Sequence, residues 1–388
     1  MKNILFKNGR FLIKDQQGYH LYIGNCCVHN GIIQGFDIDS FPFEKCFDLK
    51  GCFVIPSLFN THVHLGESLF RNIKGIWTLE KYLDYTNAYN NNLDANQRGN
   101  KWNESALYTI ANMIKNGCST ICSARSGIAQ EFGLKVLSGY PLMASGKLES
   151  FFKEGILGYQ KFRKDNNKVG ISSGLFIHSL YQIESEYLKL SQEIQNEGID
   201  FLTTHISETE NTRNKEISKF GKRPIETLLE NKLLGFKTIL VHCNYLDAFE
   251  LKLVAARKSS ITICPISNIF LGEKPLNPQL LDEYGVEWYI STDGVATGRT
   301  FSMFRQLRCI KRLYPDVDFQ NLFESITIRP ARKFLINNYA GEIKEGYAAD
   351  FVIIDYKTGV NASNIFDWLI NDTPKIKDLI VNGQSLNN

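Results

Sequence analysis

Apolar, β-branched runs alternate with stretches of helical periodicity through the middle of the chain. The runs predict eight strands, over residues 58–61, 119–123, 140–144, 172–177, 201–204, 238–241, 261–264 and 288–291. Helices fit between them, for example over 104–115, 185–197 and 303–314. Because eight strands that alternate with helices can close into a parallel barrel, the pattern predicts an α/β protein with a (β/α)₈ TIM barrel. An open doubly wound sheet is the competing architecture, but no GxGxxG motif follows an early strand.

The two ends of the chain show a different pattern, in which short strands are separated by turns. Residues 3–13 predict two strands around an Asn8-Gly9 turn, and Asn30-Gly31 predicts a second turn of the same kind. Residues 341–354 predict a turn followed by a buried strand. The ends are therefore predicted to be β-structure.

Composition and charge narrow the class of protein. The 388 residues are 43% hydrophobic and 22% charged, which is typical of a globular protein with one large domain or two smaller ones. The net charge of +3 and the lack of a dense Lys/Arg run predict no nucleic-acid or membrane partner. Nine cysteines without a CxxC pair fit reduced thiols. The first residues read as a strand and not as a signal peptide, so a cytoplasmic location is expected.

Five of the seven histidines follow predicted barrel strands, and one aspartate takes the same place after the last strand. They are His62, His64, His178, His205, His242 and Asp293. The C-terminal ends of barrel strands meet on one face, where active sites are built. His62 and His64 are two residues apart, so both point to one side of a strand. With His205 and Asp293 they form a ligand set suited to Zn²⁺ or Fe²⁺, and such an ion lowers the pKa of bound water towards ~7.

A proton carrier is also required, and Glu208 lies three residues after His205, where a carboxylate would serve as general acid and base. Each feature alone has a simpler interpretation. An HxH pair is often only a hydrogen-bonded pair, His178 could be a rim histidine, and Asp293-Gly294 could start a turn. The order of these residues at successive strand ends is what favours one metal site.

With these residues identified, the chain resembles the amidohydrolase superfamily. The closest resemblance is to the branch of the cytosine, adenosylhomocysteine and methylthioadenosine deaminases and the triazine hydrolases. The segments that carry it are residues 51–64 with the HxH pair, 204–209, 221–224, 241–243, 264–268, 291–294, 326–331 and 341–355. The resemblance implies that residues 1–56 and 339–388 form a small β-sandwich beside a barrel over 57–338.

The resemblance also implies a role for each site residue. The metal ligands would be His62, His64, His205 and Asp293. His242 and Asp293 would orient and deprotonate the bound water, and Glu208 would shuttle the proton. His178 would stand beside the substrate. Residues 171–178 hold no lysine that could bridge two metals, so one divalent ion is expected, Zn²⁺ first and Fe²⁺ as the alternative.

Departures from the family pattern bear on the substrate. Nucleoside deaminases of this branch carry an acidic residue after the first helix, where this chain has Asn90 and Asn91. The segment 65–68, which includes Glu67, differs from the family's apolar set. Arg71 and Arg125 are candidates for holding an anionic group. They join His178 and Asn268 as predicted substrate contacts.

The expected reaction is hydrolytic deamination of an amino-substituted heterocycle, such as a purine, pterin or nucleoside-like compound, by metal-bound hydroxide. The first alternative applies the same site to a cyclic amide, an imine or a carbon–halogen bond. The second is an inactive barrel that acts as a binding protein, which the complete ligand set argues against. The expected partner is a small-molecule substrate, and the resemblance is compatible with a homo-oligomer.

Overall fold

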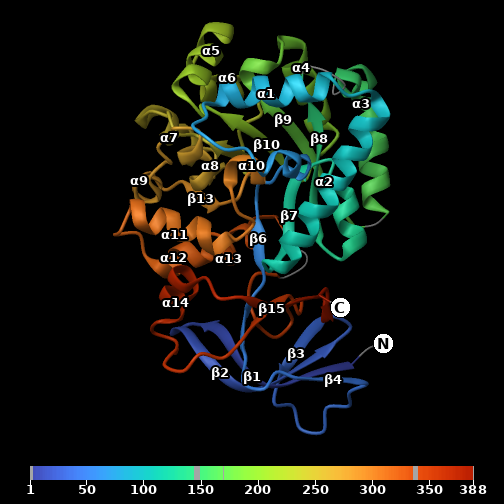
Figure 1. Cartoon of the computed structure of the whole chain (residues 1–388), viewed down its shortest axis with the longest axis vertical. Coiled ribbons are helices and arrows are strands. Elements are labelled where there is room, and N and C mark those ends of the chain that lie inside the picture. The colour runs from blue at the N-terminus through green and yellow to red at the C-terminus, as the bar shows by residue number, and fades with distance from the viewer. Residues whose placement is uncertain (1–2, 144–148, 169, 335–339, 388) are drawn as a thin grey trace.

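The eight predicted barrel strands are present in the computed structural model and pair in chain order as one parallel sheet. They are β6 (Leu58–Asn60), β7 (Cys118–Ala124), β8 (Lys135–Leu142), β9 (Ser172–Ser179), β10 (Leu202–Ile206), β11 (Thr238–His242), β12 (Ser260–Ile263) and β13 (Glu287–Ile290). The structure describes the chain except residues 1–2, 144–148, 169, 335–339 and 388. The predicted barrel is confirmed, and it forms the upper part of the molecule in Figure 1.

Side chains and one backbone bond join the first strand segment to the last. Asn60 Nδ2 donates to Thr292 Oγ1 over 2.7 Å, and the hydroxyls of Thr61 and Ser291 lie 2.6 Å apart. The backbone N–H of Asp293 donates to the carbonyl of His62 over 3.2 Å. The seam of the barrel therefore places the segments that follow β6 and β13 next to each other.

Helices surround the barrel strands. They are η1 (Leu65–Phe70), α1 (Leu79–Asn91), α2 (Ala95–Lys115), η2 (Gly127–Phe132), α3 (Glu149–Asn167), η4 (Leu180–Gln182), α4 (Ser185–Asn196), α5 (Glu210–Phe220), α6 (Pro224–Glu230), α7 (Ala248–Ala256), α8 (Pro265–Phe270), α9 (Pro278–Tyr284), α10 (Val295–Gly298), α11 (Met303–Leu313), α12 (Phe319–Glu324), α13 (Ile328–Phe334) and α14 (Ile365–Asp372). The helices predicted over 185–197 and 303–314 are confirmed to within one residue.

Two predicted starts were wrong. The helix predicted from Glu104 begins at Ala95, because Asp94 caps it by accepting from the backbone of Asn96 and Gln97. The strand predicted from Tyr140 begins at Lys135, directly after Gly133 ends η2 in the left-handed conformation. The predicted end of that strand, Ala144, lies outside the described residues.

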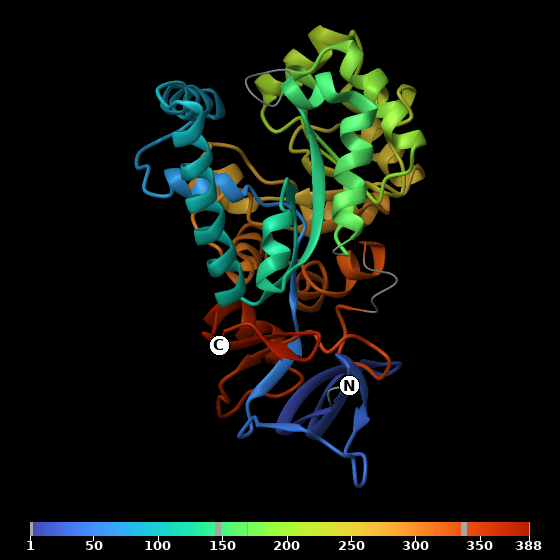
Figure 2. The same cartoon turned by 90° about the vertical axis from the view of Figure 1, so that its right-hand side faces the viewer.

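Both ends of the chain build a second sheet below the barrel (Figures 1 and 2). Its strands are β1 (Asn3–Asp15), β2 (Gly18–His29), β3 (Ile32–Phe36), β4 (Lys45–Asp48), β5 (Phe53–Pro56), β14 (Phe351–Ile354), β15 (Ile376–Val381) and β16 (Gln384–Ser385). The N-terminal β5 pairs with the C-terminal β14 in antiparallel register. The small β domain made from both ends is therefore present, while the division at residues 56 and 338 stays a prediction. Residues 335–339, which contain the second boundary, lie outside the described part.

One of the two predicted Asn-Gly turns was wrong. Asn8 and Gly9 lie within the continuous strand β1, where the pairing with β2 shifts between Phe6 and Gly9. Asn8 has a φ of 59°, so its left-handed backbone forms a bulge and the hairpin closes later, between Asp15 and Gly18. The Asn30-Gly31 turn is confirmed, because both residues have positive φ and connect β2 to β3.

Within the part of the chain that the structure describes, every helix is too short or too polar to cross a membrane.

Candidate metal centre

The first pair of site residues follows β6, the first barrel strand. Val63 between them is fully buried and donates its backbone N–H to Cys122 of the neighbouring strand β7. This alternation sends Val63 into the core and turns His62 and His64 to the opposite side. His62 is completely buried, while the side chain of His64 is 19% exposed. The pair therefore faces the barrel interior and leaves one edge open.

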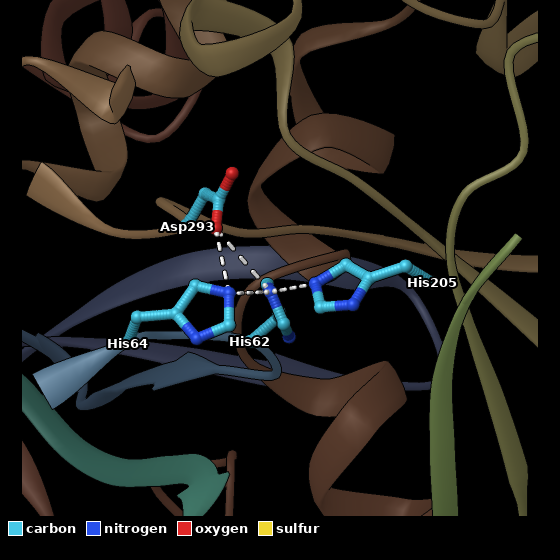
Figure 3. A group of neighbouring side chains, drawn as sticks. All are labelled: His62, His64, His205 and Asp293. Carbon is cyan, nitrogen blue, oxygen red and sulfur yellow. Dashed lines mark hydrogen bonds and ion pairs between the residues drawn. The ribbon is translucent and has the colours of Figure 1, made fainter. Parts of the chain in front are cut away.

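Four side chains from three strand ends meet at this place (Figure 3). The Nε2 atom of His62 lies 3.2 Å from Nε2 of His64 and 3.1 Å from Nε2 of His205. Asp293 Oδ1 lies 3.3 Å from Nε2 of both His62 and His64. One ligand atom from each of the four residues lies within 4.8 Å of the others. These are the four residues predicted as metal ligands.

In two of these side chains, the polar atom that does not face the other ligands makes a hydrogen bond elsewhere. His205 Nδ1 lies 2.6 Å from the carbonyl oxygen of His178, to which it donates, and this leaves Nε2 without a proton. Asp293 Oδ2 accepts from Ser267 Oγ over 2.6 Å, so Oδ1 is the atom that faces the imidazoles. Three imidazole nitrogens and one carboxylate oxygen converge, and this donor set fits a single Zn²⁺ or Fe²⁺ ion.

Burial controls the protonation of this group. It lowers the pKa of His62 and, more strongly, that of His205, so both imidazoles are neutral at pH 7. Burial by itself would raise the pKa of Asp293, but the hydrogen bond from His62 and the nearby imidazoles hold that pKa well below its usual value. Neutral imidazoles and an ionised carboxylate are the forms that bind a metal.

The predicted proton carrier lies beside the fifth histidine. Glu208 Oε1 is 3.5 Å from His242 Nε2. Burial, followed by the charges of Asp293 and Glu67, raises the pKa of Glu208 well above its usual value. Burial lowers the pKa of His242 to about 4. The raised pKa of Glu208 favours its protonated form, and His242 stays uncharged at neutral pH.

The backbone around these residues has unusual conformations. Ser207, His242 and Asp293 all have positive φ, at 44°, 69° and 61°. Side chains other than Asn and Asp rarely adopt this region, and such residues concentrate at functional sites. Ser207 follows β10, His242 ends β11 and Asp293 lies three residues after β13, so the unusual backbone lies where these segments leave the barrel strands.

Two of the predicted substrate contacts reach the metal ligands or their partners. The ring centroid of His178 lies 4.7 Å from that of His205, and burial lowers the pKa of His178 to about 3. Asn268 is fully buried and donates Nδ2 to His242 Nδ1 over 3.2 Å. Asn268 thus orients His242, and its Oδ1 has no partner within the described part of the chain.

The two predicted arginines lie on the exposed rim. The Arg71 guanidinium stacks over Tyr108 at 4.5 Å, and its Nη1 donates to the Ser68 carbonyl. The Arg125 guanidinium lies 5.9 Å from the ring centre of Trp102. Among the contacts of the described residues, neither arginine touches a metal ligand, and their role in substrate binding stays a prediction.

Sequence reasoning gave no role to a second carboxyl group beside the site. Glu67, in η1, has a buried Oε2, and a Cβ atom on Gly294 would lie only 1.8 Å from it. Burial raises the pKa of Glu67, and the charge of Asp293 raises it further. The Tyr82 hydroxyl is also buried, and neither it nor Glu67 Oε2 has a hydrogen-bond partner among the described residues. The only signal in the sequence was the departure from the family pattern at residues 65–68.

Comparison with known proteins identifies the class. Residues 53–386 match the amidohydrolase family model, so the chain belongs to the amidohydrolase family. A 5-methylthioadenosine/S-adenosylhomocysteine deaminase from Pyrococcus furiosus is 26% identical over 374 residues, covering 91% of this chain and 87% of the relative.

Solved structures support the fold. An adenosine deaminase from Xanthomonas campestris with bound zinc has a TM-score of 0.85 at 19% identity and covers 98% of this chain and 92% of its own. A triazine hydrolase variant has a TM-score of 0.86 at 16% identity and covers 99% and 94%. The predicted family and barrel are confirmed, and the predicted deaminase class agrees with the named activities of the relatives.

Proposed function

We propose that the protein is a metal-dependent hydrolytic deaminase of an amino-substituted heterocycle. The observation that carries this proposal is the convergence of His62, His64, His205 and Asp293 on one point, with Glu208 beside His242. The ligand set supports one divalent ion, and Glu208 and His242 supply the proton transfers that C–N hydrolysis needs. The named activity of the Pyrococcus relative supports the same class.

His62, His64, His205 and Asp293 would hold the ion, which would supply an activated water, because a metal lowers the pKa of bound water towards ~7. The protein's own groups then manage protons and orientation. Glu208 shuttles a proton to the leaving amino nitrogen, and its burial, which raises its pKa, favours the protonated form that donates. Asn268 holds His242, whose Nε2 lies 3.5 Å from Glu208 Oε1, and His242 would orient the water and take part in its deprotonation. The ring centre of His178 lies 4.7 Å from that of His205, and its neutral imidazole would stand beside the substrate.

The proposed substrate is a purine-like or pterin-like amino heterocycle. The relatives named for adenosine-type substrates favour a purine. Asn90 and Asn91 lie in the last turn of α1, so this chain lacks the carboxylate that would hold ribose hydroxyls there. Glu67 offers an additional buried acceptor beside Asp293, which suits a donor group on the heterocycle. The base is therefore a better candidate for recognition than the sugar.

The test is ammonia release from a panel of aminopurines, their nucleosides, pterins and triazines, with Glu208→Gln as the inactive reference. Saturable ammonia release from at least one aminoheterocycle is expected. No ammonia from any member, together with turnover of a cyclic amide or a halogenated triazine, would overturn the deaminase assignment. No turnover of any compound by metal-replete protein would favour a binding protein.

The proposed ion is Zn²⁺, with Fe²⁺ as the alternative. Metal analysis of purified protein should give about one equivalent, and Asp293→Asn should reduce it, because the carboxylate supplies the anionic ligand. Less than about a tenth of an equivalent in wild-type protein after supplementation would contradict a resident ion. A cytoplasmic location and a homo-oligomer also remain predictions.

A further inference from the structure

A cavity rich in cations lies on the outer flank of the barrel, apart from the metal ligands. Its volume is about 480 Å³, within the range of small-molecule sites. We call it the basic cavity, and its walls are Arg71, Asn72, Tyr108, Lys115, Asn116, Val295, Arg299, Thr300, Phe301, Ser302, Phe304, Arg305, Thr373, Pro374, Lys375 and Ile376. Part of this lining comes from α2, α10, α11 and the start of β15, which are labelled in Figure 1.

The basic cavity is much more positively charged than the chain as a whole. Five lining side chains are cationic and none is acidic, whereas the chain as a whole carries 44 cationic and 41 acidic residues. Lys115, Arg305 and Lys375 are exposed and make no ion pair or hydrogen bond with a described residue. Five like charges around one hollow repel each other unless an anion joins them.

The other two cations are fixed in place but not neutralised. Arg71 donates to the Ser68 carbonyl and stacks over Tyr108, while Arg299 Nη1 donates to the carbonyls of Arg71 and Ala296. Carbonyls and aromatic rings hold a guanidinium without removing its charge. The cavity therefore has two preorganised guanidinium groups and three cations that make no ion pair or hydrogen bond with a described residue.

The start of α11 adds to the same field. Ser302 is its N-cap residue, and the Ser302 side chain does not cap the helix. The first turn holds no acidic residue but contains Arg305, although a helix N-terminus carries a partial positive charge. A cation at this position is unfavourable on its own. An anion in the basic cavity would be attracted to both charges.

The shape and the aromatic wall of the basic cavity bear on the kind of molecule that fits it. Tyr108 and Phe301 meet edge to face with ring centres 5.9 Å apart, and both line the basic cavity. Tyr108 is 42% exposed, so its ring is open to solvent. The volume and the aromatic wall leave room for an organic group beside the charged one.

We propose that the basic cavity is a binding site for a small phosphorylated metabolite, with its phosphate among Arg305, Lys375 and Lys115. Phosphate is the anion that matches several converging cations and a helix N-terminus. Two walls belong to the segments that follow metal ligands: Arg71 ends η1 after His64, and Arg299 ends α10 after Asp293. An occupant would therefore contact segments that lead directly to the metal centre.

The test is calorimetric titration of the metal-replete protein with ribose 5-phosphate and with inorganic phosphate, in chloride buffers of matched ionic strength. We expect ribose 5-phosphate to bind with a Kd below about 1 mM. The double variant Arg305→Gln/Lys375→Gln should weaken binding at least about tenfold, because it removes two cations. The control Lys189→Gln/Lys252→Gln removes two exposed cations elsewhere and should stay within about twofold of wild type.

The outcomes separate the sources of phosphate and the competing explanations. Tighter binding of ribose 5-phosphate indicates a phosphate ester, and equal affinities indicate free phosphate; both support the site. No saturable binding, or equal losses in the two double variants, would overturn it. The proposal would also be overturned if wild type binds no phosphate and the Arg305→Gln/Lys375→Gln variant sediments differently from it. The cavity would then be an interface between copies of the chain. Arg305→Gln alone should fold, since it removes a cation from a helix N-terminus.

Discussion

Glu208 is the residue that distinguishes a catalytic metal site from one that only binds an ion, because it is the proposed proton carrier. Its burial and its neighbouring carboxylates raise its pKa well above the usual value, and its Oε1 lies 3.5 Å from His242 Nε2. Glu208→Gln keeps the shape but cannot transfer that proton, so kcat should fall by about 10²–10⁴-fold. The metal content should stay near wild type, because Glu208 is not among the converging ligands.

Glu210→Gln is the matched control, since Glu210 is exposed two residues further on. Its kcat should remain within about twofold of wild type, as for most exposed positions. Ammonia release and metal content are measured on the same preparations. A Glu208→Gln enzyme of wild-type kcat would show that another group carries the proton.

Gly294 is required because the Glu67 carboxylate occupies the space of a side chain there. An added Cβ would lie 1.8 Å from Glu67 Oε2 and 2.9 Å from Glu67 Cβ. The φ of Gly294 is −65°, which any residue tolerates, so contact alone opposes Gly294→Ala. The variant should lower the free energy of unfolding by about 1–3 kcal/mol and also reduce kcat, because Asp293 precedes it.

The double variant Gly294→Ala/Glu67→Ala tests this cause. Removing the carboxylate should restore much of the stability lost by Gly294→Ala, and urea unfolding of all variants measures the coupling. Gly99→Ala is the control, because nothing lies within 4 Å of a Cβ in that α2 position, and alanine should stabilise the helix by about 0.5–1 kcal/mol. Additive losses in the double variant would contradict the contact.

The site residues that could be predicted from the sequence are those that follow the barrel strands. His62, His64, His205, His242 and Asp293 could be predicted because each chemical type directly follows an apolar run, and barrel geometry brings such positions together. Glu67 could not be assigned, because its place depends on how η1 packs against the residue after Asp293. Asn268 was predicted to contact the substrate. Its hydrogen bond to His242 could not be predicted, because it joins two barrel segments that are distant in the sequence.

At the scale of elements, α5 anchors the loop that carries Glu208. Glu216 of α5 is buried and accepts from the backbone N–H of Ser207 over 3.2 Å. Burial raises the pKa of Glu216 to about 8 from an ordinary value of 4.5. The folded state therefore holds a proton that the unfolded state releases between these pH values. The stability from this group is complete below pH 4.5 and is lost as the pH rises through about 8.

Glu216→Gln should remove this dependence. The free energy of unfolding of wild type falls by up to about 1.4 kcal/mol per pH unit in the window from this group alone, and the variant should show a smaller slope. Urea unfolding at intervals between pH 5 and about 9 measures it. Glu193→Gln, an exposed glutamate on α4, should keep the wild-type slope. An unchanged slope in Glu216→Gln would show that Glu216 does not titrate in this window.

Helices and strands could be predicted where the local periodicity agrees with burial. They were predicted less well where a helix cap or a β-bulge determines where the element begins or ends. The apolar runs located all eight barrel strands, since strands buried on both faces are continuously apolar. The extra turns of α2 are polar, and the Asp94–Gln97 capping box starts them without an apolar signal. Asn8-Gly9 has the composition of a hairpin turn, but its contacts with Asn25 and Leu49 keep β1 continuous through a bulge.

At the scale of the whole molecule, long-range contacts join the barrel to the β domain. Sequence patterns indicated β-structure at both ends, but the pairing of β5 with β14 joins residues 53–56 to residues 351–354. Such pairings depend on the closed barrel bringing the ends together, and no local signal encodes them. The family resemblance, and not periodicity, supplied that part of the prediction.

Asp350 makes the join testable, because it connects the two parts from a buried position. Its carboxylate pairs with Lys135 at the start of β8 and accepts from the backbone N–H of Asn382 over 2.7 Å. The side chains of Lys135 and Asp350 are only 12% and 1% exposed. Asp350→Asn keeps an acceptor but leaves the Lys135 ammonium buried without its counter-charge. We expect a loss of about 2–4 kcal/mol in the free energy of unfolding.

Asp355→Asn is the matched control, because it breaks an ion pair with Lys377 whose side chains are 75% and 51% exposed. Exposed pairs contribute little, so this variant should lose less than about 1 kcal/mol. Urea unfolding of both variants, followed by far-ultraviolet circular dichroism, compares them. Restored stability in Asp350→Asn/Lys135→Met would identify the unpaired ammonium as the cause. Equal, small losses in the two single variants would instead mean that apolar packing of β-domain side chains such as Phe53 and Val352 in the barrel core, and not this ion pair, holds the β domain to the barrel.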